Sequence, residues 1–327
     1  MKKILAVSFS LIALFVLLLV GIYFLFPATL FNLALKAERH SAGLTKKEIQ
    51  VDDHKIVYLE GGKGQTILLL HGFGANKDNW TRFAKFLTRD YHVVIPDIPG
   101  FGESSQIQQA SYDAENQIKR IDRFTAVMKL KRFNLAGNSM GGMFAAIYGA
   151  KYPRKVSTLA LLAPGGVKSP KPSELATLLQ KGTNPLLAGS AEDFDKLINL
   201  CFVKPPFIPS RFKKVLAADA IAHSNFNKKI LEDMGWNHTD GVPSPMETFL
   251  EPYLPQIQAP VLIIWGDTDR ILDVGGVAVL EKNLKNHKTV IMRNTGHIPM
   301  MENPQETASY YISYLKGQNQ DSTRKDQ

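Results

Sequence analysis

The feature that most constrains this chain is a Gly-x-Ser-x-Gly motif at residues 137–141, with Ser139 at its centre. The apolar residues 133–136 before the motif are typical of a short strand, and residues 142–148 after it are typical of a helix. A serine placed this way occupies a nucleophile elbow, a strained turn that holds the hydroxyl out at the end of a sheet. A Cβ in place of either glycine hydrogen would collide where strand and helix approach closely. The motif therefore predicts that Ser139 is a catalytic nucleophile.

A serine nucleophile needs a base that accepts its proton and a third group that orients the base. The apolar residues 261–265 predict a buried strand that leads into a loop with two acids, Asp267 and Asp269. Residues 289–292 predict a later strand, which is followed by His297. Both loops follow the C-terminal ends of strands, where open α/β sheets bind their ligands. We expect His297 to be the base and Asp269 to orient it, because the Gly-x-x-Asp spacing carries this carboxylate clear of the strand end. Asp267 is expected to brace the turn.

The oxyanion formed during acyl transfer needs two N–H donors already in place. The residue after the nucleophile, Met140, is expected to supply one of them. A His-Gly-Phe-Gly loop at residues 71–74 follows the predicted strand 66–70. We assign the second donor to the backbone N–H of Phe73 in this loop. His71 is expected to shape the loop, since His297 already provides a base.

Strands and helices alternate from residue 66 onward, after an antiparallel hairpin predicted for residues 47–51 and 55–59. The further elements expected are strands at 92–95 and 156–162 and helices at 78–88 and 110–130. This alternation indicates an α/β fold with a mostly parallel, doubly wound sheet that helices cover on both faces.

The alternation stops over residues 168–255, a stretch rich in Pro, Leu and Phe. This stretch interrupts the core, which we assign to residues 46–167 and 256–316, and it predicts a helical cap over the active site. Nine apolar residues of the cap supply surface from which an acyl pocket could be lined: Leu178, Leu179, Leu186, Leu187, Phe194, Leu197, Ile198, Phe207 and Ile208. The polar tail at 317–327 is expected to be disordered.

The N-terminus carries an apolar segment, residues 4–26, without a charged residue. About 20 apolar residues span a bilayer, whereas the core of a signal peptide has about 7–15. We therefore predict a transmembrane anchor over residues 1–26 and a linker with an amphipathic entry segment over residues 27–45. A cleaved signal peptide is the alternative. In a bacterium, the expected arrangement is a single-pass anchor in the inner membrane with the catalytic domain in the periplasm.

Composition excludes several other classes of protein. The net charge of the 327 residues is +9, but the lysines and arginines are spread along the chain, which favours attraction to membrane lipids over nucleic-acid binding. The single cysteine, Cys201, excludes an intramolecular disulfide and is expected to be a small buried hydrophobe. His-Glu-x-x-His and Cys-x-x-Cys motifs are absent, and the glycine-rich residues 61–64 and 100–104 lack nucleotide-binding spacing. We expect neither a metal nor a cofactor.

Several short motifs together resemble one family. Residues 71–80, 96–105 and 137–142 are similar to motifs of cold-adapted bacterial lipases of the α/β-hydrolase superfamily, and residues 265–269, 272–274 and 296–297 are similar to motifs of the membrane-anchored monoacylglycerol lipases of animals. The resemblance covers about residues 45–315. It implies an α/β-hydrolase fold, an acid at Asp269, and hydrolysis of a fatty acyl ester, with monoacylglycerol as one candidate.

Two alternatives remain open. Carbon–carbon bond hydrolases of aromatic degradation carry closely similar motifs and use the same triad, but their dienoate substrates are soluble anions that call for an arginine in the pocket. The predicted bilayer anchor and apolar cap favour a lipid instead. The second alternative is a catalytically inactive scaffold or ligand-binding protein, and the intact order Ser139, Asp269, His297 argues against it.

Overall fold

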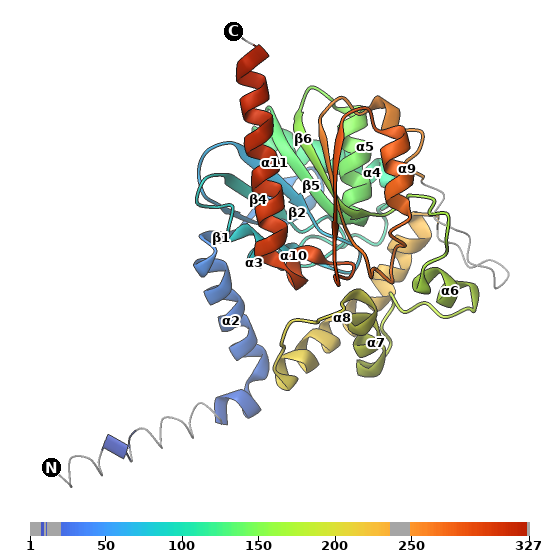
Figure 1. The fold of residues 1–327 in the computed structure, drawn as a ribbon. Helices are drawn as coiled ribbons and strands as arrows, with labels where there is room; N and C mark the ends of the chain where they lie inside the picture. Colours follow the sequence, from blue (N-terminus) through green and yellow to red (C-terminus); the bar gives the residue numbers. More distant parts are fainter. Residues whose placement is uncertain (1–7, 10, 12–20, 236–248, 326–327) are drawn as a thin grey trace.

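The computed structural model describes residues 8–9, 11, 21–235 and 249–325 of the chain (Figure 1). Within these residues, one sheet of eight strands forms the centre of the fold, in the order β1-β2-β4-β3-β5-β6-β7-β8. The strands β1 and β2 form the antiparallel hairpin expected from the sequence, and β2 pairs antiparallel with β4. All the other neighbours pair parallel. The strand bounds are β1 Leu44–Val51, β2 His54–Gly61, β3 Thr66–Leu70, β4 His92–Pro96, β5 Phe133–Ser139, β6 Val156–Pro164, β7 Val261–Gly266 and β8 His287–Met292.

The central strands are apolar throughout because helices cover both faces of the sheet. In β3, Leu68 and Leu70 face one core, while Ile67 and Leu69 face the other, as the two-residue period of a strand requires. The first core is completed by α4, α5 and α9 (Ala114–Val127, Met140–Lys151 and Gly276–Asn283) and the short η2 (Leu254–Gln256). The second is completed by α3, α10 and α11 (Thr81–Ala84, Pro299–Glu302 and Pro304–Lys325). The mostly parallel α/β sheet predicted from the sequence is confirmed.

Within the described residues, the segment between β6 and β7 carries three α-helices beside the ends of the strands (Figure 1): α6 Glu174–Gln180, α7 Ala191–Cys201 and α8 Ser210–Asp233. Two of these helices begin at serine caps, because Ser173 and Ser190 accept hydrogen bonds from the backbone N–H groups of Ala176 and Asp193. Residues 236–248 of the expected cap lie outside the described part of the chain.

Other segments differ from the sequence expectations. Residues 27–45 were expected to hold a linker and an amphipathic entry segment, and Pro27–Ser41 of this range form the helix α2, which begins with a proline at its first position. The helix expected at 78–88 is shorter: a 3₁₀ helix, η1, at Lys77–Trp80 is followed directly by α3. After α3 the chain forms turns that are closed by hydrogen bonds between residues three apart, such as the one from the N–H of Leu87 to the carbonyl of Ala84. The tail at 317–327, which was expected to be disordered, belongs to the helix α11 as far as Lys325.

Most of the predicted N-terminal anchor lies outside the described residues, which include only residues 8–9, 11 and 21–26 of that segment. Of the helices within the described residues, none has the length and apolar character needed to cross a membrane.

Candidate active site

The Gly-x-Ser-x-Gly motif forms a sharp turn between β5 and α5. Ser139 ends the strand with φ of 56° and ψ of −122°, a positive φ that is strained for any residue with a side chain. A Cβ on Gly137 would come within 2.1 Å of the carbonyl oxygen of Gly141, and a Cβ on Gly141 within 2.3 Å of the carbonyl oxygen of Leu70. The glycines of the motif are therefore required by backbone crowding, and the turn holds Ser139 at the end of the sheet.

His297 and Asp269 meet in a buried hydrogen-bonded pair, although they come from loops after different strands. The Nδ1 of His297 lies 2.8 Å from Oδ2 of Asp269. The same carboxylate accepts hydrogen bonds from the indole N–H of Trp265 at 3.1 Å and from the backbone N–H groups of Ile271 and Leu272 at 2.8 and 2.9 Å. These donors fix the carboxylate, so that it orients the imidazole with Nε2 left free to accept a proton.

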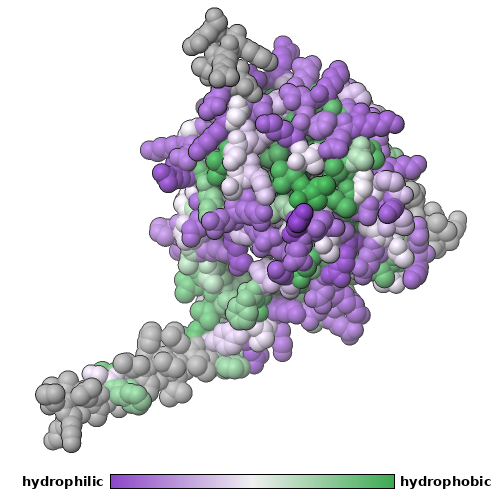
Figure 2. Space-filling view, in the orientation of Figure 1, coloured by the Kyte–Doolittle hydropathy of each residue, from purple (hydrophilic) through white to green (hydrophobic). Residues whose placement is uncertain are grey.

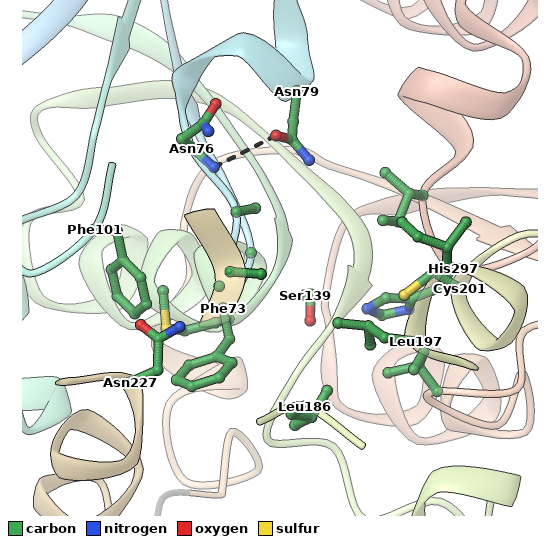
Figure 3. A pocket seen from close by; sticks show the side chains of 18 of the residues that line it. Phe73, Asn76, Asn79, Phe101, Ser139, Leu186, Leu197, Cys201, Asn227 and His297 are labelled. Carbon is green, nitrogen blue, oxygen red and sulfur yellow. Dashed lines mark hydrogen bonds between the residues drawn. The ribbon is translucent and has the colours of Figure 1, made fainter. Parts of the chain in front are cut away.

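The imidazole of His297 points toward Ser139 across the cavity (Figure 3). The backbone of His297 is held by two hydrogen bonds. Its backbone N–H donates to the carbonyl of Cys201 at 2.8 Å, and its backbone carbonyl accepts from the side chain of Asn138 at 3.0 Å. Among the described residues, the Oγ of Ser139 makes no hydrogen bond. In unliganded enzymes such catalytic contacts are often long and tighten when substrate binds.

The other candidate acid, Asp267, lies apart from the histidine. It is exposed, and its carboxylate accepts a hydrogen bond from the hydroxyl of the neighbouring Thr268 at 2.8 Å. Its backbone N–H donates to the carbonyl of Met292 at the end of β8. This position suits a residue that braces the turn, whereas Asp269 is 8% exposed and faces His297.

The loop after β3 is held by the fully buried His71. The Nε2 of His71 accepts a hydrogen bond from the backbone N–H of Ile98 at 2.9 Å, and Nδ1 donates to the carbonyl of Gly72 at 2.8 Å. Burial lowers the pKa of His71, so the ring stays neutral in this tautomer. Both nitrogens are occupied by the backbone, and the side chain therefore shapes the loop.

The two expected oxyanion donors border the same cavity. Phe73 lies in the loop that His71 holds, and its ring meets that of Phe101 edge to face at 5.5 Å. Met140 is the first residue of α5, a position whose N–H has no acceptor within the helix. Both residues thus border the same cavity as Ser139.

A buried ionic cluster behind the loop was not anticipated from the sequence. Asp97 accepts hydrogen bonds from Nζ and the backbone N–H of Lys77, at 2.8 and 2.7 Å, and from the backbone N–H of Glu103 at 2.8 Å. Nζ of Lys77 also donates to Glu103 at 2.8 Å. Burial raises the pKa of Glu103, but hydrogen bonds from Lys46 and Lys77 outweigh this effect and lower it to about 2. The Lys77 side chain is 2% exposed, and its position could be recognised only once the loops after β3 and β4 were placed together.

A cavity of about 280 Å³ extends from Ser139 between the sheet and the cap. Five of the nine predicted cap residues line it, namely Leu186, Phe194, Leu197, Ile198 and Ile208. Leu178 and Leu179 instead belong to an apolar cluster that also includes Ile271 and Leu272 of the loop after β7, and Phe207 is 88% exposed. The described lining residues include no lysine or arginine, so this cavity suits an uncharged and largely apolar ligand.

Cys201 lines the cavity next to His297 and is buried, as expected. Burial, together with the nearby charge of Asp269, raises the pKa of its thiol to about 12, so the thiol remains protonated and contributes apolar surface. Among the described residues, no group of three His, Cys, Asp or Glu side chains is arranged to hold a metal ion.

This chain is similar to a family model, to curated lipases and to a solved phospholipase structure. The family model described as "alpha/beta hydrolase fold" matches residues 65–206 and 223–304. Lipase 1 of Psychrobacter immobilis is 37% identical over 86% of this chain and 87% of its own length, and monoacylglycerol lipase ABHD6 of Homo sapiens is 30% identical over 95% and 94%. The crystal structure of a membrane phospholipase A, described as a bacterial virulence factor, is similar with a TM-score of 0.85 and 45% identity over 98% of this chain and 99% of that one.

Proposed function

Because this chain belongs to the α/β-hydrolase family, we propose that it is a serine hydrolase that cleaves carboxylic esters of fatty acids. The observation that carries the proposal is the buried pair of His297 and Asp269, 2.8 Å apart, beside a serine held in a strained elbow. This arrangement supplies the nucleophile, the base and the orienting acid that acyl transfer needs.

In the proposed reaction, Oγ of Ser139 attacks the ester carbonyl while Nε2 of His297 accepts the hydroxyl proton. The N–H groups of Phe73 and Met140 bind the oxyanion, and Asp269 stabilises the imidazolium. His297 then gives its proton to the leaving alcohol as the acyl-enzyme forms on Ser139. Water, activated by the same histidine, releases the fatty acid and restores the serine.

The composition of the cavity supports a fatty acyl substrate. Its cap side presents Leu175, Leu186, Leu197 and Phe194, and similar proteins include two named lipases and a monoacylglycerol lipase. Monoacylglycerol is therefore our first candidate substrate. A carbon–carbon bond hydrolase acting on dienoate anions is disfavoured, because no lysine or arginine is found among the described lining residues.

We also propose that the protein is held at a membrane by residues 1–26, with a single crossing and, in a bacterium, a periplasmic catalytic domain. Described residues at the end of this segment and in α2 expose large apolar side chains: Phe24 is 52% exposed, Leu25 74%, Phe26 58% and Leu33 61%. Figure 2 shows hydrophobic surface around α2, where the N-terminal segment meets the body of the protein. An exposed apolar region of this kind suits contact with lipid.

The central test is covalent labelling. A fluorophosphonate probe should modify Ser139, and Ser139→Ala should abolish both labelling and hydrolysis of p-nitrophenyl esters and monoacylglycerols, because the nucleophile is gone. Peptide mapping identifies the labelled residue, and a melting curve establishes that the variant is folded. Label found on any other residue of the wild-type protein would sink the assignment.

A further inference from the structure

One face of α8 borders the cavity along several turns. Asp219, His223, Asn227 and Leu231 recur at four-residue intervals and Met234 follows, and all five line the cavity. The N-terminal end of this row is polar and near solvent, because Asp219 is exposed. The backbone carbonyl of Asp219 lies 2.8 Å from Nδ1 of His223. Leu231 and Met234 at the other end are buried. Asn227 lies between these ends; the residue as a whole is 7% exposed, and it lines the cavity.

Asn227 differs from the other uncharged amide side chains that line the cavity. Each of those is used by the protein itself: Asn76 accepts from the N–H of Asp78, Asn79 accepts from the N–H of Asn76, Gln106 donates to the carbonyl of Gly100, and Asn138 donates to the carbonyls of Leu162 and His297. The side chain of Asn227 has no hydrogen-bond partner among the described residues. An amide in the cavity wall that makes no hydrogen bond to the protein keeps its donor and its acceptor free, so Asn227 is a candidate for binding a ligand.

The amide of Asn227 lies close to the reacting end of the cavity. Its Nδ2 lies 3.9 Å from the position that a Cβ on Gly74 would take, and Gly74 directly follows the proposed oxyanion donor Phe73. In Figure 3, Asn227 is seen on the same side of Ser139 as Phe73, with His297 on the other side. A substrate whose carbonyl oxygen is held at Phe73 would therefore bring its neighbouring atoms toward Asn227.

We propose that Asn227 binds an uncharged hydroxyl group on the alcohol part of the ester, as the glycerol of a monoacylglycerol would present; this inference rests on the proposed ester hydrolysis. An amide offers both a donor and an acceptor, which matches a hydroxyl group. A fatty acyl chain offers no polar atom beyond its carbonyl, so the alcohol is the part of such a substrate that can pair with Asn227. An anionic group would lack a partner, because the described lining residues include no lysine or arginine.

The test compares two esters of the same fatty acid, a monoacylglycerol and a methyl ester, which differ in the free hydroxyls. Asn227→Leu replaces the amide with an apolar side chain that has the same number of heavy atoms and the same branching. It should lower kcat/KM for the monoacylglycerol by about 5- to 10-fold, the loss expected for one hydrogen bond, and leave the methyl ester nearly unchanged. Asn225→Leu, on an exposed position of the same helix, is the matched control and should alter neither value.

Thermal melting separates this role from a structural one. Because Asn227 loses no hydrogen bond to the described protein, Asn227→Leu should melt close to the wild-type temperature. Equal losses on both esters, no loss on either, or a lower melting temperature that accounts for the loss would overturn the inference. A wild-type protein that hydrolyses neither ester would overturn the proposed function itself, and this inference with it.

Discussion

At the scale of single residues, two aspartates two positions apart occupy opposite environments. Asp269 is buried and paired with His297, while Asp267 is exposed and bonded to Thr268. Asp269→Asn should lower kcat by up to about 10⁴, because the imidazole loses the group that fixes its tautomer. Asp267→Asn is the matched control, and its kcat for a p-nitrophenyl ester should stay close to that of the wild type. A larger loss in the Asp267 variant would show that the orienting acid is misassigned.

Some residues of the candidate site could be predicted from the sequence, and others could not. Ser139, Asp269 and His297 could be proposed because each follows a recognisable apolar strand, and parallel strands bring their C-terminal ends to one edge. Asn227 had no such signal, since it lies within a helix whose rotation about its axis depends on contacts with the core. The same holds for Lys77, whose burial becomes evident only when Asp97 and Glu103 from another loop lie beside it.

At the scale of elements, strands were predicted better than helices. Strand patterns such as residues 66–70 are continuous apolar runs that suit a position between two cores. The N-terminal helix α2 has no residue that is fully buried. Contacts with residues far away in the sequence hold α2 in place. Arg39 forms a bidentate ion pair with Asp78 at 2.6 Å, and the ring of Phe31 meets that of Phe212 in α8 edge to face at 5.4 Å. Such long-range contacts leave no local signature.

The ionic cluster that joins β1 to the loops after β3 and β4 predicts a pH dependence of stability. The pKa of Glu103 falls from an ordinary value of 4.5 to about 2 in the folded protein, against the effect of burial and through hydrogen bonds from Lys46 and Lys77. A carboxylate with a lowered pKa stabilises the fold above its unfolded pKa, and this contribution disappears as the pH falls from about 4.5 toward 2. Glu103→Gln should therefore lower the melting temperature at pH 7 and by progressively less below pH 4.5.

Melting curves from pH 7 to pH 2.5 measure this difference. Glu48→Gln, at an exposed position of β1, serves as the control and should shift the melting temperature little at any pH, as expected for a surface pair. If the wild type and Glu103→Gln differed by the same amount at every pH, the ionised carboxylate would not be the source of the stabilisation.

At the scale of the whole molecule, α2 links the apolar N-terminal segment to the catalytic body. It contacts α8 of the cap, and its Arg39 pairs with Asp78 in η1, a few residues after the proposed oxyanion loop. Removing the segment before α2 and removing α2 itself should therefore have different consequences. A chain that begins at Pro27 should remain soluble, melt like the full-length protein and hydrolyse short soluble esters at the full-length rate. A chain that begins at Ala42 should melt several degrees lower and show a reduced kcat, because Asp78 and Phe212 lose their partners.

The full-length chain provides the comparison for membrane attachment. With residues 1–26 acting as an anchor, it should sediment with membranes and resist carbonate extraction, since a bilayer-spanning segment is not released by salt or high pH. The chain beginning at Pro27 should stay in the supernatant with the same specific activity toward soluble esters. Full-length expression that yields a soluble protein whose N-terminus lies beyond Phe26 would instead identify a cleaved signal peptide. In that case α2 would still be present, so the site would keep its Arg39 to Asp78 pair while the proposed tether would be lost.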